Sequence, residues 1–479
     1  MATRPTCVLA AATALFLAAP CLCDTHYVSP NGANQHPYVT PETAATSIQA
    51  AVDAAEYGDT VLVGRGQYME QVRLANGITL RGSGPELTAV EKPYGGDYAI
   101  RGAEDARTED LSVTFRGPRD PLGCYSLGVW FVSAPNQVID NCAVSGPLHA
   151  GVSCWGPTFG APAVIMRSSV LGAGTGVDAA GVSCDVVIDR CTIEDNGIAV
   201  HTGGNTLISR CALLRNRAAI YPSSGLVRVE STRIDGNETG LSCQVDATVR
   251  MSSCLISRSS EAFVLHRARA VELGNCTISG NGLVFYIDEA TVDMTNCIVW
   301  DNQALWDPVF PPYWGVTATY SDIQGGYQGL CNIDACPRFV DPPNRNYRLH
   351  PASPCIDAGT STGHCPRPVR DVEGKRMPAY GGRHPDQPDL VYYDMGAHEY
   401  HINRITRGPL PGELTLTWSS RGSTAYAVYY TEDLVSWHLA ADNVASDGHQ
   451  TTSWIDRGSP FHLPPWTARR RFYRILENP

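Results

Sequence analysis

The chain has 479 residues and a formal net charge of −12, from 36 lysines and arginines against 48 aspartates and glutamates. This length exceeds one ordinary hydrophobic core, so we expect two or three domains or one elongated repeat body. The acidic balance argues against nucleic acid or an anionic membrane as a partner.

The first 23 residues have the pattern of a secretory signal peptide. They carry one basic residue, Arg4, and then an apolar run from Val8 to Ala19 that is too short to span a bilayer. We expect cleavage after Cys23, with Ala19 as the alternative, and the order Pro20-Cys21 fits poorly with a lipoprotein site. No later stretch could span a membrane, so we expect a protein that is secreted or held at the cell surface.

A short amphipathic helix is predicted in the stretch TSIQAAVDAAEYGDTVLV. Thr46 and Gln49 have the spacing of a capping box, and the first strand is expected at Thr60 to Val63. The apolar face of the helix comprises Ile48, Ala51, Val52 and Ala55. We expect this helix to cover the open end of the region that follows.

A repeat of roughly 22 residues occupies the middle of the chain. A small residue opens each unit, at Cys142, Ser169, Cys191, Cys211, Thr232, Cys254, Cys276, Cys297 and Ser321. An aliphatic residue stands two positions later, at Val144, Leu171, Ile193, Leu213, Ile234, Ile256, Ile278, Val299 and Ile323. Three positions further on come Asn196, Asn216, Asn237, Asn281 and Asn302, with Ser259 in the one unit that departs. Alternating segments such as Val186 to Ile188 and Val292 to Met294 precede the small residue and predict a second strand.

Such a unit cannot bury its apolar face alone, because it has short alternating strands and no helical periodicity. Stacked units cover one another, with equivalent residues about 4.8 Å apart. The sequence therefore predicts an all-β fold, a right-handed parallel β-helix with an N-terminal helical cap. The cysteine row is expected to face inward, with serine and threonine as substitutes. The asparagines are expected to turn the chain with left-handed backbone and to hydrogen-bond from coil to coil.

Two segments resemble known families. The stretches YVSPNG, GDTVLVGRGQY and GITLRGSG resemble the opening of the pectin-lyase-like, right-handed β-helix proteins secreted by many bacteria. The stretch RFVDPPNRNYRLHPASPCIDAG, with DMGAHEY after it, resembles the segment that closes the β-helix in a group of bacterial surface proteins, often ahead of a sorting anchor. These resemblances imply a β-helix over residues 24–330 and a closing segment over residues 331–400.

Residues 401–479 alternate as short antiparallel strands and predict a small β-sandwich. Its expected core comprises Leu414, Leu416, Trp418, Tyr426, Val428, Tyr430 and Ile475. This part resembles a fibronectin-type or immunoglobulin-like module. No sorting motif follows it, which argues against covalent attachment to the surface.

The cysteines and histidines show no metal-binding spacing, so we predict no metal and no cofactor. His201 and His266 lie three coils apart, about 14 Å, and like His149 are expected to be surface or packing residues. The acidic set Asp341, Asp357, Asp371, Asp394 and Glu399 lacks the spacing of a calcium loop, so calcium stays an unsupported alternative, and we expect these residues to hydrogen-bond the irregular backbone of the closing segment. In an exported protein the candidate disulfides are Cys331 with Cys336 and Cys355 with Cys365.

Long loops in the early coils predict a ligand groove. The candidate residues are Arg116, Arg119, Tyr125, Trp130, His149, Trp155, Phe159, Asp178 and Asp185. Aromatic faces suit sugar rings and arginines suit carboxylates. A second aromatic cluster, Trp300 to Trp314, is expected to pack the end of the solenoid, with a glycan platform as the alternative.

No catalytic motif of the polysaccharide-degrading enzymes on this fold is present, and the adjacent pairs Glu194-Asp195 and Asp288-Glu289 are expected to be solvated. The leading hypothesis is therefore a monomer that binds polysaccharide or another extracellular partner. The alternatives are a lyase or hydrolase of acidic glycans and a passive structural surface protein. Arginine, histidine and acidic side chains converging in one groove would favour an enzyme, and aromatic side chains alone would favour binding.

Overall fold

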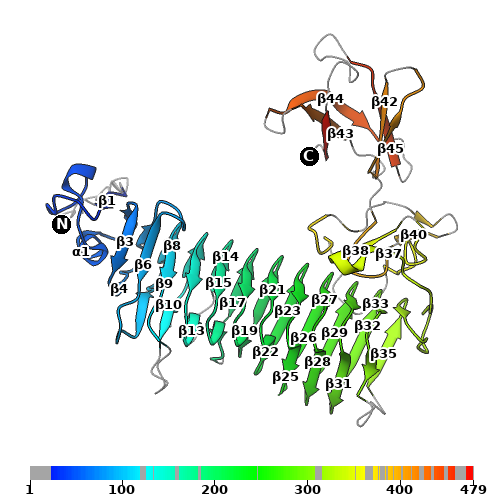
Figure 1. Ribbon diagram of the computed structural model, residues 1–479, viewed down its shortest axis with the longest axis horizontal. Helices are drawn as coiled ribbons and strands as arrows, with labels where there is room; N and C mark the ends of the chain where they lie inside the picture. Colours follow the sequence, from blue (N-terminus) through cyan, green and yellow to red (C-terminus); the bar gives the residue numbers. More distant parts are fainter. Residues whose placement is uncertain are drawn as a thin grey trace, which may run out of the picture.

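The computed structural model describes most of the chain. The described residues are 23–118, 126–132, 134–156, 161–181, 185–244, 246–307, 315–350, 352–361, 370–375, 377, 383–384, 387–391, 393–400, 403–410, 413–419, 425–432, 436–446, 451–458 and 471–477. Within them the chain winds repeatedly through three parallel sheets, which we name A, B and C in the order each coil visits them (Figure 1).

Sheet A has 13 described strands: β1 Thr25–Val28, β2 Thr60–Val63, β5 Thr79–Arg81, β8 Arg107–Glu109, β11 Val138–Asp140, β14 Ala163–Met166, β17 Val186–Asp189, β20 Thr206–Ser209, β23 Leu226–Glu230, β26 Thr248–Ser252, β29 Ala270–Gly274, β32 Val292–Thr295 and β35 Val316–Thr319. Sheet B has 12: β3 Gly66–Met69, β6 Thr88–Glu91, β9 Ser112–Thr114, β12 Ala143–Ser145, β15 Ser169–Leu171, β18 Thr192–Glu194, β21 Ala212–Leu214, β24 Arg233–Asp235, β27 Leu255–Ser257, β30 Thr277–Ser279, β33 Ile298–Trp300 and β36 Asp322–Ile323. Sheet C has 11: β4 Val72–Arg73, β7 Tyr98–Arg101, β10 Leu127–Phe131, β13 Ala150–Cys154, β16 Thr175–Ala179, β19 Ile198–Thr202, β22 Ala218–Pro222, β25 Thr239–Cys243, β28 Glu261–His266, β31 Leu283–Asp288 and β34 Ala304–Trp306. The predicted parallel solenoid is confirmed.

The N-terminal cap contains the short 3-10 helix η1, Pro41–Thr43, and the helix α1, Ile48–Ala54, with Ile48, Ala51 and Val52 buried. The predicted capping box is wrong, because the helix starts one residue later and Ser47 is its N-cap. The carboxylate of Glu70 accepts from the Ile48 and Gln49 amides and from the Ser47 hydroxyl. The Glu70 carboxylate, from the loop after β3, thus takes the place of a capping box and satisfies amides at the start of the helix.

The cysteine row faces inward as predicted, and Cys142, Cys191, Cys211, Cys254, Cys276 and Cys297 are all buried. Burial raises the pKa of the Cys142 thiol to about 12, so it stays protonated and packs as a small apolar group. In one repeat unit the predicted register is wrong by one residue. Ser168, not Ser169, lies beside Cys142, and its hydroxyl accepts from the Cys142 amide at 3.0 Å. Val170 is therefore buried, and Leu171 is 41% exposed, because a one-residue shift exchanges the two faces of a strand.

The asparagine row forms the predicted coil-to-coil ladder at the turn from sheet B to sheet C. The amide oxygen of Asn216 accepts from the backbone and side-chain nitrogens of Asn196 at 3.0 and 3.1 Å. Asn237 does the same for Asn216, and Asn302 for Asn281. The left-handed residues, however, are those just before the five asparagines and just before Ser259: Asp195, Arg215, Gly236, Arg258, Gly280 and Asp301. The asparagines thus hold a bend that their predecessors make.

The segment after the last coil folds back over the corner between sheets A and B. It contains β37 Phe339–Asp341, η2 Pro342–Asn344 and β38 Asn346–Leu349, and further on the hairpin β39 Arg383–His384 and β40 Gln387–Val391. The side-chain amide of Asn275 donates to the Asp394 carbonyl oxygen, and that of Asn296 donates to the Thr360 carbonyl oxygen. The Ala397 amide donates to the Thr277 hydroxyl. This part of sheet B is therefore covered.

The structure shows no disulfide among the described cysteines, and the two candidate pairings stay predictions. Cys331 and Cys336 are exposed free thiols. Cys355 is a buried free thiol, and its Sγ donates to the Asp322 carboxylate at 3.1 Å. Cys365 lies outside the described residues. The fold-back of the closing segment gives Cys355 a carboxylate partner on β36, which the spacing of cysteines along the chain could not indicate.

The C-terminal strands form two antiparallel three-stranded sheets. They are β41 Asn403–Arg407, β42 Leu414–Ser419 and β45 Thr451–Asp456 in one, and β44 His438–Ala445, β43 Ala425–Thr431 and β46 Phe472–Glu477 in the other. One hydrophobic cluster joins them, with Leu416, Trp418, Tyr426 and Val428 at its centre. Tyr430 instead packs beneath the guanidinium of Arg471, 4.5 Å from its ring centre. The described residues contain no helix with the length and apolarity that crossing a membrane requires.

Candidate functional site

Sheet C carries one continuous outward column of side chains. In register from coil to coil these are Arg73, Arg101, Trp130, Ser153, Asp178, His201 and Tyr221. Each lies between two inward residues, as His201 lies between the buried Val200 and Thr202. Successive residues of a strand point to opposite faces, so these side chains project from the outer face of sheet C, where Ser153 alone of the seven is fully buried. We call it the axial column.

Three polar groups meet at the C-terminal end of the axial column. Asp178 Oδ1 lies 3.3 Å from His201 Nδ1, and the His201 and Tyr221 rings are 5.2 Å apart in an edge-on arrangement. The His201 side chain is 25% exposed and that of Asp178 is 17% exposed. In the neutral tautomer that carries its proton on Nδ1, beside the Asp178 carboxylate, the Nε2 atom of His201 has a free lone pair.

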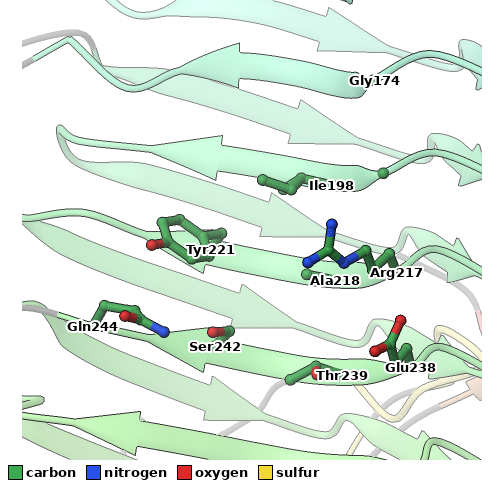
Figure 2. Close-up of a pocket in the computed structure, with 10 residues that line it drawn as sticks. Gly174, Ile198, Arg217, Ala218, Tyr221, Glu238, Thr239, Ser242 and Gln244 are labelled. Carbon is green, nitrogen blue, oxygen red and sulfur yellow. The ribbon is translucent and has the colours of Figure 1, made fainter.

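An open groove of about 620 Å³ lies beside these residues (Figure 2). Its lining comprises Gly174, Gly197, Ile198, Arg217, Ala218, Tyr221, Glu238, Thr239, Ser242 and Gln244. Figure 2 shows Arg217 and Tyr221 projecting to the same side of β22, with Glu238, Ser242 and Gln244 on the next coil. Among the described residues no carboxylate forms an ion pair with the exposed Arg217, whereas the nearby Arg215 is bound by Glu194 and Asp195.

Two glycines create the end of this groove that lies nearer the N-terminal coils. His149, Gly174, Gly197, Arg217 and Glu238 occupy equivalent positions, each just before its strand in sheet C. A Cβ atom at Gly197 would lie 2.4 Å from the Gly174 carbonyl oxygen, and one at Gly174 would lie 2.8 Å from the His149 carbonyl oxygen. The close backbone approach therefore excludes side chains there. A gap is left between His149 and Arg217.

The structure brings together part of the predicted ligand site. Trp130 and Asp178 lie in the axial column, and His149 and the 48% exposed Trp155 flank β13 on the same sheet. The exposed Arg116 lies before β10. Asp185 lies apart, at the start of sheet A, where its carboxylate accepts from the Asn205 amide at 3.0 Å. Arg119, Tyr125 and Phe159 lie outside the described residues.

Arg217, Tyr221 and Glu238 are not among the residues predicted from the sequence, and His201 is predicted there only as a surface or packing residue. A signal was present, because Asp178, His201 and Tyr221 each stand five positions after the slot of the asparagine row, at Ala173, Asn196 and Asn216. Extending the repeat register across the turn would have aligned them.

Other predictions concern side chains outside the groove. Glu194 and Asp195 bind Arg215, Asp288 lies 3.5 Å from His266, and Glu289 pairs with Arg267. Trp306 stacks on Phe285 at 5.4 Å, which confirms the packing interpretation for the described part of the second aromatic cluster. No group of three or more potential metal ligands occurs in the described ranges.

Comparison with known proteins agrees with this architecture. The family described as "Right handed beta helix region" matches residues 150–322. The solenoid is a right-handed β-helix. No curated protein matches the chain.

Several solved structures are similar to the chain. The A-module of mannuronan C-5 epimerase AlgE4 from Azotobacter vinelandii is 18% identical, covering 58% of this chain and 95% of its own, with a TM-score of 0.37. Pectin methylesterase PemA from Erwinia chrysanthemi is 11% identical, with 65% and 92% covered and a TM-score of 0.31. Polygalacturonase from Erwinia carotovora ssp. carotovora is 10% identical, with 64% and 96% covered and a TM-score of 0.32. The function of this β-helix must therefore be argued from its own side chains.

Proposed function

We propose that this β-helix protein is secreted and binds an acidic polysaccharide in the groove on sheet C. One observation carries the proposal: the exposed Arg217 lines an open groove and forms no ion pair with a carboxylate among the described residues. A guanidinium recognises a carboxylate through two parallel hydrogen bonds. In a chain with a net charge of −12, such a cation marks the place where a uronate would be held.

The rest of the groove suits a sugar chain. Tyr221 offers an amphipathic ring, and Glu238, Ser242 and Gln244 offer hydrogen-bonding groups to hydroxyls. The groove is open along the surface, so a polymer can enter without passing its ends through a closed cavity. Sheet B in the late coils is covered by the closing segment, and the groove on sheet C remains accessible to such a polymer.

A second candidate function, cleavage of the same polymer by β-elimination, is favoured by the contact of Asp178, His201 and Tyr221. His201 Nε2 would take the C5 proton of a uronate, and the C–H electron pair would form the C4–C5 double bond as the C4–O bond breaks. The leaving oxygen would take the Tyr221 hydroxyl proton, and the imidazolium would return a proton to the tyrosinate. Arg217 would stabilise the charge that develops on the carboxylate.

The test measures binding and product together. The purified chain is titrated with polygalacturonate and, as a neutral control, with dextran, with and without calcium, while the ultraviolet absorbance of unsaturated products is recorded. We expect binding of polygalacturonate alone and a loss of affinity of about tenfold in Arg217→Ala, the cost of one charge-assisted contact. Arg228→Ala, an exposed arginine on sheet A, should bind like the parent protein.

The possible results distinguish the two candidate functions. Equal affinity of the parent and Arg217→Ala, or tighter binding of dextran, would overturn the proposed acidic ligand. Binding without any unsaturated product would remove the lyase candidate and leave the binding function. If product forms, His201→Ala should abolish it while polygalacturonate is still bound.

A further inference from the structure

The N-terminal end of the axial column, which we call its upper end, contains a second group of cationic and aromatic side chains. Arg73 and Arg101 are in register on β4 and β7, and Arg101 is in register with Trp130 on β10. The Arg101 guanidinium lies 4.9 Å from the centre of the Trp130 ring. The Tyr98 ring lies 5.8 Å from the same indole.

Two arginines on adjacent strands repel each other unless an anion lies between or beside them. On sheet A the equivalent problem is solved within the chain, where Arg81 and Arg107 share the carboxylate of Glu109. No described carboxylate forms an ion pair with Arg73 or Arg101. Both guanidinium groups are therefore available to bind an anion.

These arginines border a depression of about 700 Å³ between α1 and the upper strands of sheet C. Asp53 and Glu104 also line it, and Asp53 accepts a hydrogen bond from the Gln49 side chain at 2.8 Å. The depression has room for a sugar residue beside Arg73 and Arg101, which both line it, and Trp130 packs against Arg101 outside this lining.

We infer that Arg73, Arg101 and Trp130 form a second subsite, which binds uronate residues of the same polysaccharide chain. The inference rests on the proposed function of the groove at Arg217. Arg73 and Arg101 would bind carboxylates, and the indole beneath the Arg101 guanidinium would hold that guanidinium in place. We call this the upper subsite.

The two sites are far apart on one face. From β7, which carries Arg101, to β22, which Arg217 precedes, there are five strand spacings, or about 24 Å along the solenoid axis. A short oligosaccharide therefore occupies one site, and an extended polymer running along the solenoid axis occupies both. Binding at one site then raises the effective concentration of the chain at the other.

Isothermal titration of the full chain with digalacturonate and with long polygalacturonate tests this arrangement. The parent protein should bind two digalacturonates, and Arg73→Ala and Arg101→Ala should each bind one with full affinity at the remaining groove. Both variants should bind the long polymer at least about tenfold more weakly than the parent, because the second contact is lost. Arg228→Ala is the charge-matched control on sheet A. Arg73 has no ring contact with Trp130 among the described interactions, so its variant separates lost binding from lost packing.

The inference fails if Arg73→Ala and Arg101→Ala bind two digalacturonates and hold the polymer as tightly as the parent. Should Arg217→Ala weaken binding in that case, the proposed groove stands and only the upper subsite is excluded. An equal loss in Arg228→Ala would attribute the effect to overall charge and would also overturn the inference. Absence of binding by the parent protein would instead overturn the proposed function.

Discussion

At the scale of the residue, the row of cysteines requires a small side chain with a weak donor, and sulfur itself is not required. Each thiol donates to the carbonyl oxygen two residues earlier, as Cys276 does to Gly274 at 3.4 Å. Ser168, Thr232 and Ser321 make the same contact with a hydroxyl. The surrounding backbone therefore accepts either atom.

Cys276→Ser should consequently retain the fold. Its hydroxyl can donate to the Gly274 carbonyl oxygen, so we expect a loss of less than about 1.5 kcal/mol in the free energy of unfolding. Cys276→Leu adds volume to a fully buried position and should cost roughly 1–3 kcal/mol. Urea unfolding followed by circular dichroism measures both. A serine variant less stable than the leucine variant would contradict the interpretation.

Asn216 is buried and accepts two hydrogen bonds from Asn196 while donating through its own nitrogens to Asn237. Asn216→Ala leaves the buried donors of Asn196 without this acceptor, and we expect a loss of about 2–4 kcal/mol. Ser259 provides the matched control, because its hydroxyl has no partner in the described structure. Ser259→Ala should change stability little, and equal losses in the two variants would show that the ladder contributes nothing specific.

At the scale of the element, the closing segment contains buried carboxylates. Burial raises the pKa of Asp394 to about 7 and that of Asp371 to about 6. Asp394 accepts from the Asp357 and Tyr400 amides, and Asp371 accepts from the Glu373 and Lys375 amides. The backbone of the segment is thus organised around groups that are partly protonated near neutral pH.

This burial predicts how the segment responds to pH. A carboxyl group whose pKa is higher in the folded state binds more protons folded than unfolded, so its contribution to stability falls as pH rises from about 4 to about 7. His398 acts in the opposite direction, because burial lowers its pKa to about 4 and its contribution rises over about pH 4 to 6.5. Hydrogen exchange over residues 352–361 and 393–400, corrected for intrinsic rates, should show protection that decreases from pH 6.5 to 7.5, where only the carboxylates still titrate.

Asp394→Asn should flatten this decrease, because the amide does not titrate. Cys331→Ser, at an exposed position of the same segment, is the control and should keep it. A decrease of the same size in Asp394→Asn would assign the effect to other groups.

At the scale of the whole molecule, the sequence predicted the solenoid because its repeat spacing was regular. It could not decide between Ser168 and Ser169, since each serine is followed two residues later by an aliphatic residue, Val170 or Leu171. The group that caps the N-terminus of α1 was not predicted, because Glu70 comes from a loop more than 20 residues away.

The candidate site was predictable to a smaller extent. Trp130, Asp178 and His149 were found because they lie in or beside long loops, but His201 and Arg217 belong to regular coils. Their importance depends on which face the strand presents and on what its neighbours leave uncovered. Both are properties of three-dimensional packing across coils, and no local pattern reports them.

Gly174 and Gly197 have a consequence for how such a protein can change. The groove exists where two successive coils lack a side chain at this position, and the strands beside it keep their buried apolar residues, such as Val177 and Val200. Shifting that pair of glycines by one coil would displace the groove by about 4.8 Å along the axis while the interior residues stay as they are. A side chain at Gly197 would meet the Gly174 carbonyl oxygen at 2.4 Å, so such a move also requires a local change in the spacing of the coils. The position of the binding surface is therefore tied to the backbone at this turn and not to the interior residues.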